Sequence, residues 1–224
     1  MRTTFFTFAA AALMLVNGIC AHAQIPFNYT PQQIENQRLL NRYLWSSKVE
    51  VRVKSKVWAV ASFQARYDQD GKVVLTQVGG GSLDPASGVV FTQRNQREID
   101  KDKLNPLIVE ITGQLRAYQN MTPDQVQAAL KGASRQPGTG EMKDTDQLTA
   151  ANVLKSGDRV TLWVDHNTGI QRRVVVESTA EAEKFTSTWT FARLPNGPWY
   201  VNQRVVEVPG KNLRMVTQNS SFWR

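Results

Sequence analysis

The sequence predicts an α+β domain, in which helices pack on one face of a large curved antiparallel sheet. Three observations support this prediction. Apolar and polar residues alternate with period two in several segments, and short turns join a series of such segments in the last third of the chain. Segments with helical spacing separate an early group of strands from this later group. Segregated runs of strands and helices are typical of α+β domains.

The first 23 residues have the three parts of a secretory signal peptide. Arg2 supplies a positive charge, an apolar run covers residues 5–19, and Ala21-His22-Ala23 is an Ala-x-Ala cleavage pattern. The apolar run is shorter than the about 20 residues that a membrane-spanning helix needs. We therefore predict that residues 1–23 are a signal peptide and that residues 24–224 form a single exported domain.

Two other interpretations of this segment are an acylated lipoprotein signal at Cys20 and an uncleaved anchor. A lipoprotein signal has a small residue before its cysteine, whereas Ile19 stands at that position, and the apolar run is short for an anchor. After cleavage behind Ala23 the domain would contain no cysteine. That composition excludes disulfides, thiolate metal sites and cysteine nucleophiles.

The chain is basic, with a formal net charge of +8 at pH 7 that falls to +7 when Arg2 leaves with the signal peptide. The bases are spread along the sequence rather than gathered in runs. An exported protein of this kind is expected to meet anionic lipid headgroups, cell-wall polymers or acidic partners rather than nucleic acid. We predict no nucleic-acid partner and leave peripheral membrane contact and envelope-protein partners open.

The first ordered element is expected to be a helix from Thr30 to Trp45, since Thr30, Pro31 and Gln33 occupy the positions of a capping box. Alternating residues then predict strands, the second and third of which form a hairpin. Gly79-Gly80-Gly81 is expected to be a strand end or bulge, because no lysine follows it as in a phosphate loop. The strands cover residues 49–53, 57–67 and 72–78, and a loop covers 84–88.

Helical spacing returns in the middle of the chain and strands return after it. Helices are expected over residues 99–118 and 122–132, followed by a mobile loop at 134–147 that ends in a short strand. The closing meander has five strands joined by Gly, Asn and Pro turns. These strands are expected at residues 159–165, 170–178, 184–194, 199–208 and 213–222.

The residues give no positive sign of catalysis. The exported domain contains one histidine, His166, in a turn, and zinc spacings and nucleophile motifs are absent. The pairs Asp144 with Asp146 and Glu181 with Glu183 lie in polar segments without the apolar surroundings that raise the pKa of a catalytic acid. We predict no catalytic residue, no metal site and no cofactor.

Apolar side chains share strand faces at even spacing. Leu162 and Val164 share one face of their strand, and Phe185, Trp189 and Phe191 share one face of theirs. The same holds in two other strands, for residues 57, 59, 61, 63, 65 and 67 and for Trp199, Val201 and Val205. Such a sheet either packs helices as an ordinary filled core or encloses space for an apolar ligand. Both interpretations stay open. The expected apolar ligand-binding residues are Phe63, Tyr67, Leu162, Val164, Phe185, Trp189 and Phe191.

Arginines recur along the closing strands. In neighbouring antiparallel strands they can form a basic rim that contacts a phosphate or carboxylate headgroup, and the plainer alternative is a set of solvated positions. Arg172 and Arg204 are the headgroup candidates. The full set is Arg172, Arg173, Arg193, Arg204 and Arg214.

Two segments resemble a known family. Residues 162–173, Leu-Trp-Val-Asp-His-Asn-Thr-Gly-Ile-Gln-Arg-Arg, join a Trp-x-Asp strand to a Thr-Gly turn and a basic strand, and residues 191–197 with Trp199-Tyr200 give the next strand and its Asn-Gly turn. With the order of the elements, they resemble the periplasmic lipoprotein-carrier superfamily, the LolA-like and LppX-like proteins.

That resemblance implies a LolA-like domain over residues 24–224, built as an unclosed half-barrel with helices covering its concave face. It also implies a periplasmic location and non-catalytic binding or transport of a lipid or another apolar ligand. The alternative function is an envelope protein–protein interaction or structural protein with a filled core.

Overall fold

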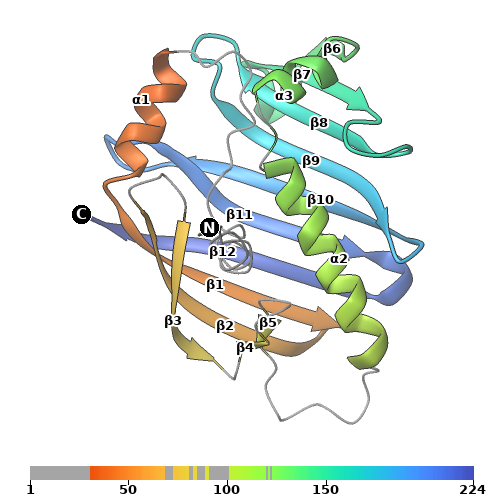
Figure 1. The fold of residues 1–224 in the computed structure, drawn as a ribbon. Helices are drawn as coiled ribbons and strands as arrows, with labels where there is room; N and C mark the ends of the chain where they lie inside the picture. Colours follow the sequence, from red (N-terminus) through yellow and green to blue (C-terminus); the bar gives the residue numbers. More distant parts are fainter. Residues whose placement is uncertain are drawn as a thin grey trace, which may run out of the picture.

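The computed structural model describes residues 31–68, 73–80, 83–84, 89–90, 101–119, 121 and 123–224. The expected signal peptide, its cleavage site and the loop at 85–88 lie outside the described residues. Within them, ten strands form one antiparallel sheet that does not close, and helices lie on one of its faces (Figure 1). The predicted α+β fold with an unclosed curved sheet is therefore confirmed.

The strand order across the sheet is β3-β2-β1-β12-β11-β10-β9-β8-β7-β6, and β4 with β5 forms a separate short pair. The helices are α1 (Pro31–Leu40), α2 (Lys101–Gln119) and α3 (Pro123–Leu130). The strands are β1 (Leu44–Val53), β2 (Lys56–Tyr67), β3 (Val73–Gly80), β4 (Leu83–Asp84), β5 (Val89–Val90), β6 (Ser134–Pro137), β7 (Thr145–Ala151), β8 (Arg159–Asp165), β9 (Gln171–Ala180), β10 (Glu183–Arg193), β11 (Trp199–Val208) and β12 (Leu213–Trp223).

The first and last strands of the large sheet are neighbours. β1 pairs with β12 from Leu44 opposite Trp223 to Val53 opposite Leu213. This pairing joins the three N-terminal strands to the meander of the C-terminal part. One face of each of these strands is covered and the other faces solvent. The residues along each strand therefore alternate between buried and more exposed positions.

The helix α2 crosses the strands on one face, which we call the helix-covered face; the opposite side is the open face (Figure 1). The apolar side of α2 packs on the sheet through fully buried residues, as its three- and four-residue spacing predicts. These residues are Leu104, Leu107, Ile108, Ile111 and Leu115. They meet apolar residues of β1, β2 and β8 to β12 in the main core.

Several predicted boundaries are wrong, including the start of the first strand, which begins at Leu44 rather than at residue 49. The first helix ends at Leu40 rather than Trp45, because Asn41 and Arg42 turn the chain and Trp45 is already part of β1. Residues 134–147, expected as a loop, contain β6 and the start of β7. All four residues of β6 are exposed at the edge of the sheet, so this strand carries no apolar alternation that would have revealed it.

Bulges move two residues away from the face expected for them. Val57 lies opposite Arg52 on the open face, since the β1–β2 register shifts there and both Trp58 and Ala59 are buried. Val205 lies opposite Thr188 and Val216, also on the open face, because the β10–β11 register shifts. The bulge expected near Gly79 is confirmed by a shift in the β2–β3 register.

Candidate ligand-binding face

Five of the seven expected ligand-binding residues come together in the main core. Leu162, Phe185 and Trp189 are at most 2% exposed, and Val164 and Phe191 pack against them. The indole N–H of Trp189 donates to Ser187 Oγ at 2.8 Å, so this buried ring has a hydrogen-bond partner. These side chains belong to, or pack against, the core cluster that also contains the buried residues of α2.

The space under the far end of α2 is small. An apolar pocket between α2, α3, β7 and β8 has a volume of about 10 Å³. That volume is at the lower limit for a single water molecule. The described part of the core around this pocket is therefore closely packed. Its lining includes Tyr118, Val126, Leu130, Val160 and Leu162.

The other two expected residues lie in separate apolar clusters. Tyr67 packs with Leu40, Trp45, Ala65 and Val73 at the end of the sheet near α1. Phe63 packs with Val49, Ala61 and Leu75 in what we call the β1–β2 patch. No residue of a described helix belongs to this patch. The structure therefore does not gather the seven residues into one cluster.

A band of polar side chains separates the β1–β2 patch from Trp189. Across the helix-covered face Trp189 lies opposite Arg204, Arg204 opposite Thr217, and Thr217 opposite Val49. Arg204 is only 9% exposed, and its buried side chain has an interaction partner, as a buried charge requires. We call Ser47, Arg204, Thr217 and Asn219 the polar band; all four are buried.

Asn219 carries an unusual buried atom within this band. Its Nδ2 donates to the carbonyl of Val201 at 2.9 Å, whereas its Oδ1 is buried without a hydrogen-bond partner in the structure. Most buried polar atoms are paired, so an orphaned acceptor calls for an explanation. The sequence analysis missed Asn219 and Thr217, although both lie at even spacing from the buried Leu213 and Met215 of the same strand.

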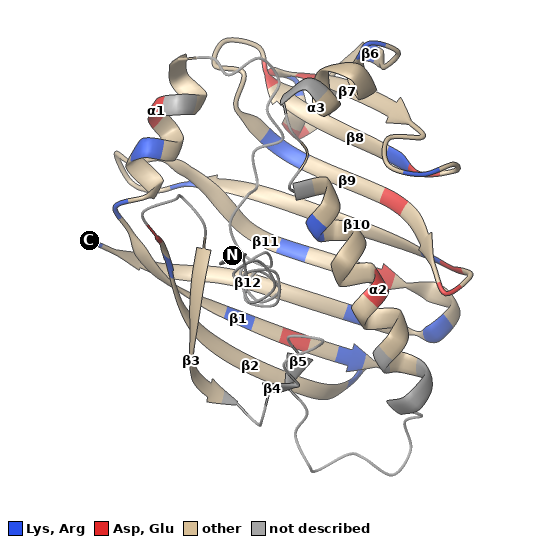
Figure 2. Cartoon of the chain, in the orientation of Figure 1, with Lys and Arg blue, Asp and Glu red and all other residues tan. Residues whose placement is uncertain are grey.

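The predicted basic rim does not form, because its members have separate environments. Arg172 stacks over Trp199 at 3.7 Å, Arg173 lies 5.1 Å from the Trp163 ring, and Arg193 donates to the carbonyl of Gly197. Arg204 turns to the helix-covered face. Figure 2 shows basic residues spread over many strands and turns with acidic residues between them. The headgroup candidates Arg172 and Arg204 are therefore in different surroundings.

Polar contacts fix α2 to the sheet at its C-terminal end. The Tyr118 hydroxyl donates to Asp158, which also accepts backbone N–H groups from residues 153–155. Burial alone would raise the pKa of Asp158, but these hydrogen bonds hold it below its usual value. Burial and the neighbouring carboxylate raise the pKa of Tyr118. One turn earlier, Gln114 donates to the carbonyl of Thr179 at 2.8 Å.

The helix α1 is held by amide side chains rather than by a broad apolar face. Asn36 donates to the carbonyl of Trp199 at 2.9 Å and accepts its N–H at 2.6 Å. Gln33 donates to the carbonyl of Gly169 at 2.7 Å. Both side chains are buried. The buried positions of this helix that the structure describes are Gln33, Asn36 and Leu40.

The titratable groups near the β8–β9 turn make hydrogen bonds and ion pairs within and beside that turn. Asp165 Oδ1 accepts the N–H groups of Asn167 and Thr168. His166 Nδ1 lies 3.3 Å from Asp146, which also pairs with Arg135. Among the described residues, no group of three or more His, Cys, Asp or Glu side chains is placed to hold a metal ion.

Comparisons with known proteins give only distant structural matches. No family model matches this sequence, and no curated protein does. A DUF1329 family protein from Desulfovibrio piger is 14% identical and has a TM-score of 0.42, with 85% of this chain and 89% of that chain covered. A LolA superfamily protein from Nitrosomonas europaea is 11% identical and has a TM-score of 0.36, with 85% and 90% covered.

A third match is a domain described as an outer membrane lipoprotein-sorting protein, from Vibrio parahaemolyticus. It is 7% identical and has a TM-score of 0.42, with 85% of this chain and 89% of that chain covered. A LolA superfamily protein, from the group that the sequence resembles, is thus among the distant matches. None of the helices in the described ranges has the length and apolar character to cross a membrane.

Proposed function

We propose that this chain is a non-catalytic periplasmic binder or carrier of a lipid or another ligand with a large apolar part. The observation that supports it is the β1–β2 patch, a buried apolar cluster on the helix-covered face beside a band of buried polar groups. No residue of a described helix belongs to this patch. An apolar surface with a few convergent polar groups is the usual composition of a small-molecule site.

The β1–β2 patch and the polar band each have a role in the proposal. The apolar part of the ligand packs against Phe63, Val49 and Ala61. Arg204 holds an anionic group, since a guanidinium keeps its charge in proteins and pairs well with phosphate or carboxylate. Asn219 Oδ1 accepts a ligand hydroxyl or amide, which would remove its unpaired state.

The other expected residues have supporting roles in the same proposal. Leu162, Val164, Phe185, Trp189 and Phe191 form the wall that continues from the polar band under α2. Tyr67 and Arg172 lie toward the α1 end of the sheet, where a long ligand would extend.

A second candidate function is an envelope interaction protein with a filled core. The close packing around the 10 Å³ pocket favours it, because a lipid carrier needs several hundred Å³ of apolar space. The two candidates differ in one measurable property. A carrier retains a ligand, whereas an interaction protein retains a protein partner.

Native mass spectrometry of the protein released from the cell envelope without detergent, with lipid extraction of the same sample, tests the proposal. We expect a stoichiometric lipid or acylated species. Ala61→Phe, which fills the β1–β2 patch, should abolish its retention, and Ser62→Phe, the neighbouring position on the open face, should not. Circular dichroism checks that both variants fold. An apo mass without uptake of an apolar dye would overturn the carrier proposal and favour the filled-core alternative.

A further inference from the structure

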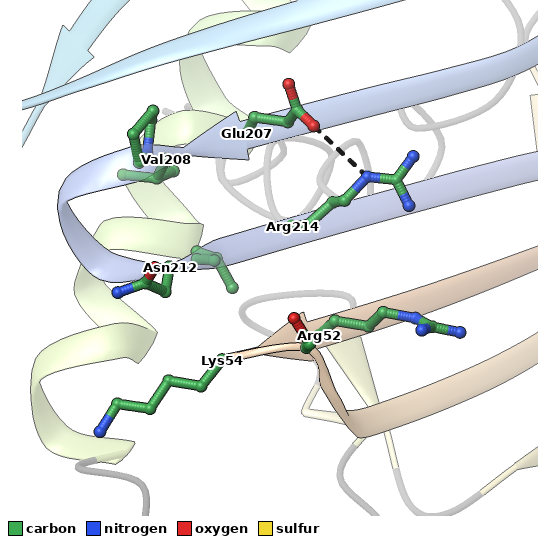
Figure 3. Close-up of a pocket in the computed structure, with 9 residues that line it drawn as sticks. Arg52, Lys54, Glu207, Val208, Asn212 and Arg214 are labelled. Atoms are coloured by element: carbon green, nitrogen blue, oxygen red, sulfur yellow. Dashed lines mark ion pairs between the residues drawn. The ribbon is translucent and has the colours of Figure 1, made fainter.

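A depression of about 500 Å³ opens on the other side of the sheet, where β1, β11 and β12 end near the β11–β12 turn (Figure 3). Three basic residues and one acidic residue belong to its lining. The complete lining is Arg52, Lys54, Ser55, Glu207, Val208, Pro209, Asn212, Leu213 and Arg214.

The strand register places two arginines directly opposite each other in this pocket. Arg52 of β1 is the Cα partner of Arg214 of β12. Both point to the open face, because the residues on either side of each along its strand are buried in the core. Like charges directly opposite in a sheet are destabilising. Among the strand pairs that the structure describes, no other two basic residues are direct partners.

Each arginine uses only one side of its guanidinium for an ion pair. Arg52 Nε contacts Glu50, and Arg214 Nε lies 3.4 Å from Glu207. Both side chains remain more than 40% exposed, so their terminal Nη groups are accessible. In Figure 3 the two guanidinium groups extend in the same direction along neighbouring strands, and the Lys54 side chain extends in the opposite direction. Each guanidinium is a planar fork that matches the oxygens of a phosphate group.

Lys54 adds a third positive charge at the end of β1. It has a φ of 48° and starts the tight turn between β1 and β2, and its N–H donates to the carbonyl of Asn212. This bond fixes the strand end beside the β11–β12 turn. A left-handed conformation in a lysine costs free energy. The opposed arginines break a local rule of strand pairing, and such breaks are expected at functional sites.

We propose that this pocket binds a phosphate group, held by Arg52 and Arg214. It lies on the opposite face from the proposed apolar site and does not depend on it. Two sources share this chemistry, namely free phosphate compounds and the headgroup of an anionic phospholipid. A headgroup bound here would place the open face against a membrane surface.

The test titrates the protein with inorganic phosphate and with glycerol 3-phosphate by calorimetry, against chloride at equal ionic strength. In parallel it measures flotation with vesicles of phosphatidylcholine alone and of phosphatidylcholine mixed equally with phosphatidylglycerol. The double variant Arg52→Gln with Arg214→Gln removes the site. The matched control is Arg159→Gln, which removes an exposed arginine of the same face that pairs across strands with Glu177 at 3.7 Å.

We expect the double variant to lose roughly tenfold or more in affinity for each arginine removed, and the control to bind as the unchanged protein does. Saturable binding of the soluble phosphates identifies a free ligand, and binding only to the phosphatidylglycerol vesicles identifies a lipid headgroup; both support the proposal. Absence of binding in both assays would overturn it. An equal loss in Arg159→Gln would overturn it as well, since it would show attraction by net charge alone.

Discussion

Asp158 is the polar residue whose loss should weaken the fold most clearly. Its carboxylate accepts the Tyr118 hydroxyl and the N–H groups of Val153, Leu154 and Lys155, the last three at 2.6, 2.9 and 3.0 Å. A hydrogen bond to a charged group contributes about 1.5–3 kcal/mol. After Asp158→Ala the loop N–H groups can bond water instead, so the loss is smaller than the sum of the four hydrogen bonds. We expect this variant to lower the free energy of unfolding by about 3–5 kcal/mol.

Two milder variants divide this effect. Tyr118→Phe removes one donor and leaves the carboxylate with its backbone partners, so the loss should be about 1.5–3 kcal/mol. Asp158→Asn keeps an acceptor but loses the charge. The exposed Asp144, changed to alanine, is the control and should leave stability within about 0.5 kcal/mol. Urea denaturation followed by tryptophan fluorescence measures all four free energies.

The pH dependence follows from the lowered pKa of Asp158. A carboxyl group with a depressed pKa in the folded state contributes stability above its unfolded pKa, about 3.9, and loses it as the pH falls through the folded value. The difference between the unchanged protein and Asp158→Asn should therefore be constant near neutral pH and shrink below about pH 4. A loss under 0.5 kcal/mol for Asp158→Ala, or a difference that grows in acid, would refute this reasoning.

Three further predictions concern single positions. Phe185→Ala should cost about 3–5 kcal/mol, since the ring is 2% exposed in the main core, and a denaturation midpoint equal to that of the unchanged protein would contradict the packing. Gly138→Ala should cost about 1–3 kcal/mol because its Cβ would lie 1.9 Å from a backbone carbonyl oxygen, whereas Gly210→Ala meets only a mobile carboxylate and should be milder in the same thermal melts. Asn36→Ala should cost about 2 kcal/mol by leaving a β11 backbone pair unbonded, and the exposed Gln37→Ala should be near neutral by chemical denaturation.

The strands were predictable where alternation and turns act together. From residue 159 onward, segments with alternating apolar residues are joined by short turns, and every expected strand is present there. The edge strand β6 was not predictable, because strands at an edge need no apolar face. The end of α1 was missed because its buried side includes Gln33 and Asn36, whose role depends on backbone groups more than 130 residues away.

The candidate site was predictable in composition but not in grouping. Even spacing identified Phe185, Trp189 and Leu162 as inward residues, and all three are buried. The assignment of strand faces from period-two alternation fails at a bulge, and the bulge in β11 places Val205 on the open face. The pairing of Arg52 with Arg214 could not be read from the sequence, since it depends on which strands are neighbours.

The pairing of β1 with β12 has a consequence for the order in which this molecule can form. The hairpin of β1 and β2 is local and can fold early, but its other edge gains a partner only from the final residues of the chain. Contacts between such distant residues slow folding, because a long loop must close before they stabilise anything. A chain that lacks its last strand would leave two unpaired edges facing each other, each able to recruit a foreign strand. Complete synthesis of the C-terminus is thus what protects the N-terminal hairpin from aggregation.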